Sequence, residues 1–304
     1  LSAGGIIMII VTGGAGFIGS NIVKQLNERG RNDILIVDDL TDGSKIRNLQ
    51  MLDYYDYVDC IDFDDAVATN TFDVGPIEVV FHEGACADTM NYDGRYMMHN
   101  NFEGTKNLFH YCQERRVPFI YASSASTYGH GKKGFTEKPE CEEALNPYAY
   151  SKLFFDRYVR RFEKDLQSQV VGLRYFNVFG PNENHKGNMA SLVRQMFYKL
   201  RETGEITLFE GTDGYENGGQ LRDFIYVKDV VNVNFFFWEH PEISGIFNCG
   251  TGEAKSFNRF MQAVIDYNGS GNLRYIPFPE VLKGKYQSFT EADTTKLMAA
   301  GYDK

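Results

Sequence analysis

The segment IIMIIVTGGAGFIG, residues 6–19, decides the fold of this chain. Its first half, Ile6–Val11, is a continuous apolar run of the kind found in strands buried on both faces. Glycines follow at positions 13, 16 and 19, and apolar residues then recur at helical spacing until Gly30. In such a turn the glycines permit a tight reversal, a close approach to a pyrophosphate and close helix packing. The segment therefore predicts a nicotinamide dinucleotide site, with the phosphates at the helix N-terminus.

The rest of the chain repeats this alternation of strand and helix. Short apolar strands are predicted over Ile34–Val37, Val79–Phe81, Phe119–Tyr121 and Val170–Tyr175, with helices over 93–116 and 148–163. The pattern predicts an α/β fold, a doubly wound parallel (Rossmann) sheet occupying mainly residues 8–180. Residues 181–304 are rich in glycine and loops. They predict a smaller, interleaved C-terminal α/β domain that binds substrate, with some later segments returning to the sheet.

Composition excludes several classes of protein. The 304 residues carry a net charge of −10, which argues against binding to nucleic acid or to an anionic membrane. No apolar stretch approaches the roughly 20 residues that span a bilayer. Five widely spaced cysteines without a Cys-x-x-Cys pair indicate reduced thiols and a cytoplasmic protein. The scattered histidines and cysteines predict no metal site.

An acidic strand end follows the glycine turn by about 20 residues, as in dinucleotide-binding folds. Asp38 ends the second predicted strand, where a carboxylate binds the ribose 2′-hydroxyl of NAD. Lys45 lies close enough in sequence to meet the 2′-phosphate of NADP instead. The sequence leaves both dinucleotides open.

A second motif carries acid–base chemistry. Tyr148 and Lys152 form Tyr-x-x-x-Lys, so both side chains share one face of a helix. A neighbouring ammonium favours the phenolate and is expected to lower the pKa of Tyr148. Ser123 and Ser124 follow the strand Phe119–Tyr121, at the sheet edge where open α/β sheets bind ligands. A serine there can hydrogen-bond a reacting hydroxyl.

Together these motifs resemble the extended short-chain dehydrogenases/reductases, the group of sugar-nucleotide epimerases and dehydratases. Three further segments resemble that group: RYFNVFGP (174–181), RDFIYVKDV (222–230) and NCGTG (248–252). Four others resemble a narrower family, the ADP-L-glycero-D-manno-heptose 6-epimerases: FHEGAC (81–86), HKGNMAS (185–191), LFEG (208–211) and KGKYQ (283–287). This similarity runs from Met8 to Lys304.

The narrower resemblance implies a reaction and a set of partners. It implies oxidation at C6″ of ADP-heptose by tightly bound NADP, a transient 6-ketone, and return of the hydride to the other face. Such an enzyme supplies heptose for the inner core of lipopolysaccharide. The resemblance also implies a homo-oligomer, such as a pentamer.

The resemblance further assigns residues to roles. Tyr148 and Lys186 match two acid–base positions, Ser124 orients the reacting oxygen, and Lys152 tunes Tyr148. Positions that match dinucleotide-binding residues are Gly13, Gly16, Phe17, Ile18, Gly19, Asp38, Asp39, Lys45, Glu83, Gly84, Ala85, Cys86, Ala87, Asn100, Tyr148, Lys152 and Val178. Positions that match substrate-binding residues are Ser124, Asn177, Asn188, Gln195, Phe209, Glu210, Gly211, Thr212, Arg222 and Tyr286.

Departures from the family pattern bear on the cofactor and the substrate. Cys60 replaces a lysine and Asp39 an asparagine, and both changes make the charge near the adenosine ribose less positive. Gln195 replaces a histidine, and the loop 213–220 is longer than the family pattern predicts. Two alternatives remain open, a different nucleotide-sugar epimerase such as a UDP-hexose 4-epimerase, and a non-catalytic NAD(P)-binding sensor.

Overall fold

The computed structural model describes residues 6–280 and 286–303. Its centre is a seven-stranded parallel sheet in the order β11-β6-β5-β4-β1-β2-β3, and this confirms the predicted doubly wound fold. These strands are β1 Met8–Thr12, β2 Ile34–Asp38, β3 Asp56–Asp59, β4 Ile77–His82, β5 Phe119–Ser124, β6 Val170–Tyr175 and β11 Gly245–Cys249.

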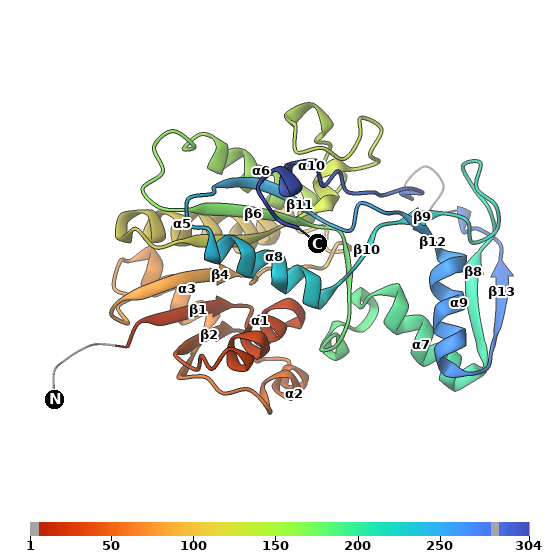
Figure 1. Cartoon of the computed structure of the whole chain (residues 1–304), viewed down its shortest axis with the longest axis horizontal. Helices are drawn as coiled ribbons and strands as arrows, with labels where there is room; N and C mark the ends of the chain where they lie inside the picture. Colours follow the sequence, from red (N-terminus) through yellow and green to blue (C-terminus); the bar gives the residue numbers. More distant parts are fainter. Residues whose placement is uncertain (1–5, 281–285, 304) are drawn as a thin grey trace.

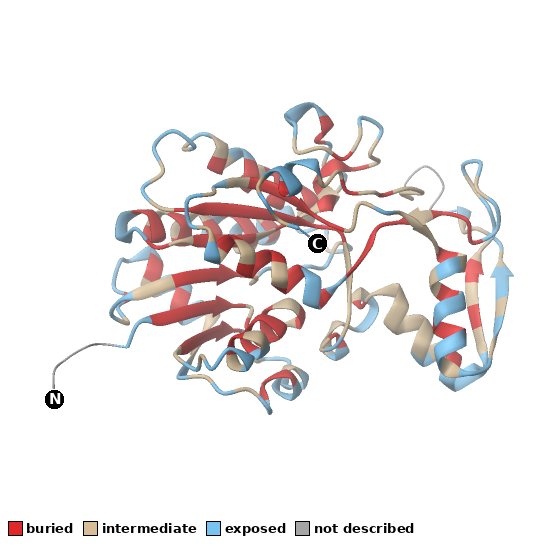
Figure 2. Cartoon of the chain, viewed as in Figure 1, coloured by how far each residue is buried: buried red, intermediate tan, exposed pale blue. Residues whose placement is uncertain are grey.

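Two helical layers cover the sheet (Figure 1). Both faces of the sheet are apolar and therefore need to be covered. In β1, Ile9 and Val11 pack into the core beneath one layer, whereas Ile10 packs into the core beneath the other. One layer holds α1 Phe17–Glu28, α2 Ile46–Leu49 and α8 Val227–Glu239. The other holds α3 Cys60–Ala68, α5 Gly104–Arg115 and α6 Pro147–Arg160. Figure 2 shows that the central strands of the sheet, such as β1, β2 and β6, are buried along their whole length, whereas the edge strand β3 is not.

A smaller α/β unit lies beyond the carboxyl ends of the strands (Figure 1). Its core forms between the helices α7 Leu192–Thr203 and α9 Phe257–Asn268 and the parallel pair β8 Glu205–Phe209 and β13 Asn272–Ile276. Short connecting strands are β7 Asn177–Phe179, β9 Leu221–Arg222, β10 Phe224–Tyr226 and β12 Lys255–Ser256. Between these segments the chain returns to the sheet as α8 and β11, and α10 Thr295–Ala299 later packs near β11.

Three features differ from the sequence-based expectations. The sequence pattern does not predict β3 and α3, because β3 is a short edge strand with acidic residues at both ends. The helix expected over 93–116 is divided into α4 Gly94–Met98, a π-helical turn η2 His99–Glu103, and α5. The strand expected to end at Tyr121 continues to Ser124. Four 3-10 turns complete the description: η1 Gly43–Lys45, η3 Ala125–Tyr128, η4 Pro139–Cys141 and η5 Asn184–Met189.

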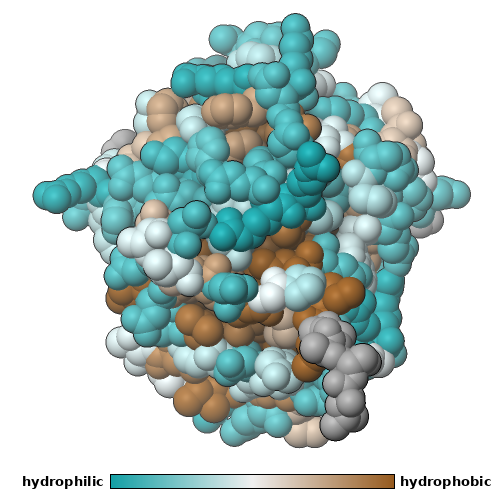
Figure 3. Space-filling model, turned by 90° about the vertical axis from the view of Figure 1, so that its left-hand side faces the viewer, coloured by the Kyte–Doolittle hydropathy of each residue, from teal (hydrophilic) through white to brown (hydrophobic). Residues whose placement is uncertain are grey.

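The order of the strands places a ligand site. The chain turns outward in opposite directions from β1 and β4, which are neighbours, so their carboxyl ends form the switch point where open α/β sheets bind ligands. The opposite end of the sheet faces the viewer in Figure 3, with hydrophilic side chains over much of it and an apolar patch below its middle. None of the described helices is long and apolar enough to cross a membrane.

Candidate active site

The glycine turn between β1 and α1 leaves no room for side chains. A Cβ on Gly19 would lie 2.1 Å from the carbonyl oxygen of Gly13. Gly13 has a φ of +65°, and a Cβ there would lie 2.7 Å from the backbone nitrogen of Gly84. Gly16 caps α1 without a side chain, so the N–H groups of the first turn are available to a ligand. The turn thus fits the pyrophosphate of a dinucleotide.

The carboxylate of Asp38 is buried at the end of β2. Its Oδ2 accepts from the Ala15 N–H at 2.8 Å, and its Oδ1 accepts from Lys45 Nζ and the Asp39 N–H, each at 2.8 Å. Lys45 therefore neutralises Asp38 and stays beside it. The Cys60 thiol brings no positive charge to this region, and burial together with Asp59 raises its pKa to about 11.

The loop after β4, which contains Glu83–Ala87, is held by a residue that the sequence analysis missed. Asn101 Oδ1 accepts from the Cys86 N–H at 2.8 Å, and Asn101 Nδ2 donates to the Cys86 carbonyl at 3.0 Å. The same Nδ2 lies 3.1 Å from Ser151 Oγ on the helix α6. Asn100, the residue predicted to contact the dinucleotide, is its neighbour in the π-helical turn. This turn therefore ties the loop to the helix that carries Tyr148.

Tyr148 and Lys152 lie at the start of α6. Asn146 caps this helix by accepting from the Ala149 N–H at 2.8 Å, which sets the position of its first turn. Burial raises the pKa of Tyr148, and the side chain of Ser124 partly counters that shift. In the protein without bound ligands, the expectation that the pKa of Tyr148 is lowered is therefore wrong. Lys152 Nζ instead donates to the Ala122 carbonyl at 2.9 Å, and burial lowers its pKa to about 8.

The two serines at the end of β5 have different surroundings. Ser123 Oγ donates to Asp156 Oδ2 at 2.9 Å inside the core. Ser124 stays at the edge of the site, and its Oγ accepts from Ser126 Oγ at 2.8 Å. Asp156 lies one turn beyond Lys152 on α6 and also pairs with the buried Arg174. This pair joins β5, β6 and α6, so it holds Ser124 and the start of α6 in a common frame.

Lys186 lies on η5, close to the start of α1. Its Nζ stands 5.6 Å from the centre of the Phe17 ring, at the start of α1. Burial lowers the pKa of Lys186, and the charge of Glu183 opposes that shift. Gln195 is a predicted substrate residue, but its Nε2 donates to the carbonyls of Ala190 at 2.7 Å and Asn188 at 3.2 Å. Its amide group supports the loop that carries Lys186.

Arg222 is a buried cation on β9, among the residues that the sequence predicts to bind substrate. Its guanidinium donates to the backbone carbonyls of Leu221 and Gln287 and lies 5.1 Å from the ring of Tyr286. Among the described residues, no carboxylate forms an ion pair with it. An unpaired buried cation favours the binding of an anion.

The remaining predicted residues surround Arg222 or lie on the adjoining strands. Asn177 Nδ2 donates to the Asp223 carbonyl at 3.0 Å, and Val178 pairs with Ile225 across β7 and β10. Phe209 packs against Tyr286, with 6.3 Å between ring centres. Glu210, Gly211 and Thr212 lie in the loop that follows β8. Residues 283–285 of the KGKYQ stretch lie outside the described residues.

Comparison with known proteins gives consistent matches. Residues 9–250 match the model of the NAD dependent epimerase/dehydratase family. An ADP-L-glycero-D-manno-heptose-6-epimerase from Alkalilimnicola ehrlichii is 58% identical over 296 residues, covering 97% of this chain and 92% of that protein.

Solved structures agree with the fold. The ADP-L-glycero-D-manno-heptose-6-epimerase of Helicobacter pylori superposes with a TM-score of 0.80 at 27% identity, covering 96% of this chain and 89% of that one. A UDP-glucose 4-epimerase of Thermus thermophilus, solved with NAD, gives a TM-score of 0.78 at 27% identity and covers 98% of this chain and 94% of that one. The fold alone therefore does not separate heptose from hexose epimerases.

Proposed function

The chain belongs to the NAD dependent epimerase/dehydratase family, and we propose that it converts ADP-D-glycero-D-manno-heptose to ADP-L-glycero-D-manno-heptose by inverting C6″. The 58% identity with a protein of that name, over nearly the whole length of both chains, carries this proposal. A UDP-hexose 4-epimerase is the weaker alternative, since such a structure matches at 27% identity. The Ser124, Tyr148 and Lys152 cluster argues against a non-catalytic sensor.

Inversion requires a proton to leave the C6″ hydroxyl oxygen as hydride leaves C6″, and both to return after the sugar has presented its other face. Each of the two orientations therefore needs an acid–base group. A bound nicotinamide dinucleotide supplies the hydride acceptor and donor. We infer that Tyr148, beside Ser124, exchanges a proton with the C6″ hydroxyl in one of these orientations. Lys186 is the second acid–base group, and its lowered pKa brings the amine closer to neutrality. Lys152 contributes a positive charge beneath the site.

The ADP part of the substrate has a separate binding region. The planar guanidinium of Arg222 suits a diphosphate because its donors can bind two oxygens at once. Tyr286 and Phe209 add aromatic surface beside it. We infer that the smaller unit selects the nucleotide while the sheet holds the dinucleotide.

Conversion between the two epimers tests the activity. The purified protein is incubated with ADP-D-glycero-D-manno-heptose, and the two C6″ epimers are separated chromatographically. Both epimers should appear without added dinucleotide. Tyr148→Phe should lower the rate about 10²–10⁴-fold, the usual contribution of an acid–base group. Turnover of a UDP-hexose with no change in the heptose would overturn the proposal.

We also propose that the resident dinucleotide is NADP. Lys45 neutralises Asp38, which would otherwise repel a 2′-phosphate. Mass spectrometry of the dinucleotide released from the denatured protein should reveal a 2′-phosphate, and a mass matching NAD would contradict this choice.

We further propose that the protein is a cytoplasmic homo-oligomer. Light scattering of the purified protein measures the number of subunits.

A further inference from the structure

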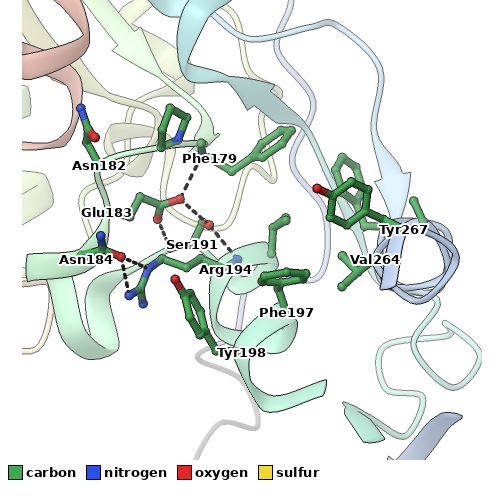
Figure 4. A pocket seen from close by; sticks show the side chains of 15 residues that line it. Phe179, Asn182, Glu183, Asn184, Ser191, Arg194, Phe197, Tyr198, Val264 and Tyr267 are labelled. Carbon is green, nitrogen blue, oxygen red and sulfur yellow. Dashed lines mark hydrogen bonds between the residues drawn. The ribbon is translucent and has the colours of Figure 1, made fainter. Parts of the chain in front are cut away.

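A buried carboxylate closes the segment that carries Lys186. Glu183 is only 2% exposed, and three donors converge on it. Its Oε1 accepts from the Gly180 N–H at 3.0 Å and from Ser191 Oγ at 2.8 Å, and its Oε2 accepts from the Ser191 N–H. Figure 4 shows these bonds. Because Gly180 and Ser191 stand at the two ends of the segment, Glu183 joins the ends and leaves Lys186 between them.

The carboxylate also fixes the segment to α7. Ser191 is the N-cap of that helix, and its Oγ accepts from the Arg194 N–H at 3.2 Å while it donates to Glu183. A carboxylate can accept all of these hydrogen bonds because it carries acceptors only. Bonds to a charged acceptor are also stronger than neutral ones.

Side-chain amides attach the same segment to the dinucleotide side. Asn182 adopts a left-handed φ of +75°, and its Nδ2 donates to Ser20 Oγ at 2.9 Å. Asn21 Nδ2 donates to the Pro181 carbonyl at 3.1 Å. The Lys186 N–H bonds the Glu183 carbonyl at 3.0 Å, so one turn separates the buried carboxylate from the lysine. The segment thus bridges α7 and α1, and Lys186 lies beside Phe17.

On one side, the segment between Gly180 and Ser191 borders an open groove and is not covered by tightly packed side chains. A groove of about 650 Å³ borders the segment on the side that Figure 4 shows. Glu183 and Ser191 line it, together with aromatic residues of α7 and α9 such as Phe197 and Tyr267. Because the groove is open, side-chain packing does not fix the segment on this side. The hydrogen bonds of Glu183 fix it instead.

We propose that Glu183 is a positioning residue that holds Lys186 in place as the acid–base group for one epimer. This inference rests on the proposed function. A general structural role for Glu183 would affect both epimers, whereas a positioning role affects mainly one, because Lys186 lies on this segment and Tyr148 lies on α6. The step assisted by Tyr148 is set by α6 and β5, on the other side of the glycine turn.

The oxidation of each epimer gives a separate readout. Protein carrying its own dinucleotide is mixed rapidly with one epimer, and the absorbance of the reduced nicotinamide is followed. Lys186→Met and Tyr148→Phe identify which epimer depends on which group. Glu183→Ala should slow only the epimer that depends on Lys186, by about 10²-fold, the effect of a displacement of about 1 Å.

Two further variants make the test specific. Asn184→Ala removes an exposed bond between Arg194 Nη2 and Asn184 Oδ1 (2.8 Å) in the same segment, and it should leave both oxidations unchanged. Ser191→Ala removes one donor to Glu183 and should slow the same epimer as Glu183→Ala, though less. It also serves if Glu183→Ala does not fold.

The outcomes separate the two proposals. Equal slowing of both epimers in Glu183→Ala and Ser191→Ala, or no slowing of either, would overturn the role of Glu183 and leave the proposed function standing. If the unmodified protein oxidises neither epimer, the proposed function fails, and the positioning role fails with it.

Discussion

Glu83 lies where the dinucleotide turn meets the core. Its backbone lies beside Gly13, whereas its side chain reaches Tyr175 at the carboxyl end of β6. Oε1 accepts from the Tyr175 hydroxyl at 2.8 Å, and Asn234 Nδ2 donates to that hydroxyl at 2.9 Å. Oε2 is buried and has no hydrogen-bond partner among the described residues. Burial raises the pKa of Glu83 to about 7, although Tyr175 and Lys152 oppose the shift.

Replacing Glu83 with glutamine should change how stability depends on pH. The folded protein keeps this proton up to about pH 7, whereas the unfolded chain releases it near 4.5. The folded form therefore binds more protons in this window, so the free energy of unfolding falls as pH rises from 4.5 through 7. Glutamine carries no titratable proton and can still accept from Tyr175. Without dinucleotide, Glu83→Gln should be about 3 kcal/mol more stable than the parent at pH 8.

Urea unfolding of the stripped protein at pH 5 and pH 8 measures this difference. At pH 5 the difference should be less than about 1 kcal/mol, because folded Glu83 is still protonated and pH 5 lies only slightly above the pKa of 4.5 in the unfolded chain. Glu202→Gln, a change at an exposed position on α7, is the control and should follow the parent at both values. A Glu83→Gln protein with no gain at pH 8 would show that the folded protein satisfies the charged carboxylate.

Among the elements, those with a strong local pattern could be predicted from sequence. β1, the glycine turn and α1 follow from an uninterrupted apolar run, three spaced glycines and a helical repeat. α6 follows from apolar residues and from the Tyr-x-x-x-Lys spacing. In contrast, β3 has acidic residues at both ends and lies at an edge, so neither face of it requires the apolar residues that mark a buried strand.

The π-helical turn and the buried carboxylates could not be predicted in the same way. An extra residue within one turn leaves little trace in a sequence of ordinary helical character, so the pattern around η2 predicts one continuous helix. Asp156 and Glu183 are among the most buried side chains of the chain, yet charged residues are mostly exposed in proteins. Their roles depend on donors that only the fold brings to them.

At the scale of the whole molecule, the proposed function divides two binding tasks between two parts of the chain. In that proposal the sheet and the glycine turn hold the dinucleotide, whereas Arg222 and Tyr286 belong to the segments beyond the carboxyl ends of the strands. Substitutions in the two parts should therefore have opposite consequences. Gly19→Ala would place a Cβ 2.1 Å from the Gly13 carbonyl oxygen, so the turn must open and the dinucleotide should be lost. Its affinity for ADP should remain.

Arg222→Lys should have the opposite effect: it should weaken the binding of ADP and leave the dinucleotide bound. Lysine keeps the charge but loses the planar pair of donors, and bonds to charged groups contribute about 1.5–3 kcal/mol. Calorimetric titration with ADP should show about 10- to 10²-fold weaker binding, with the retained dinucleotide unchanged. Gly94→Ala, at the start of α4 where a Cβ meets nothing within 4 Å, is the matched control for Gly19→Ala. If Arg222→Lys shed the dinucleotide, or Gly19→Ala weakened ADP binding equally, the two tasks would be coupled and this division would be wrong.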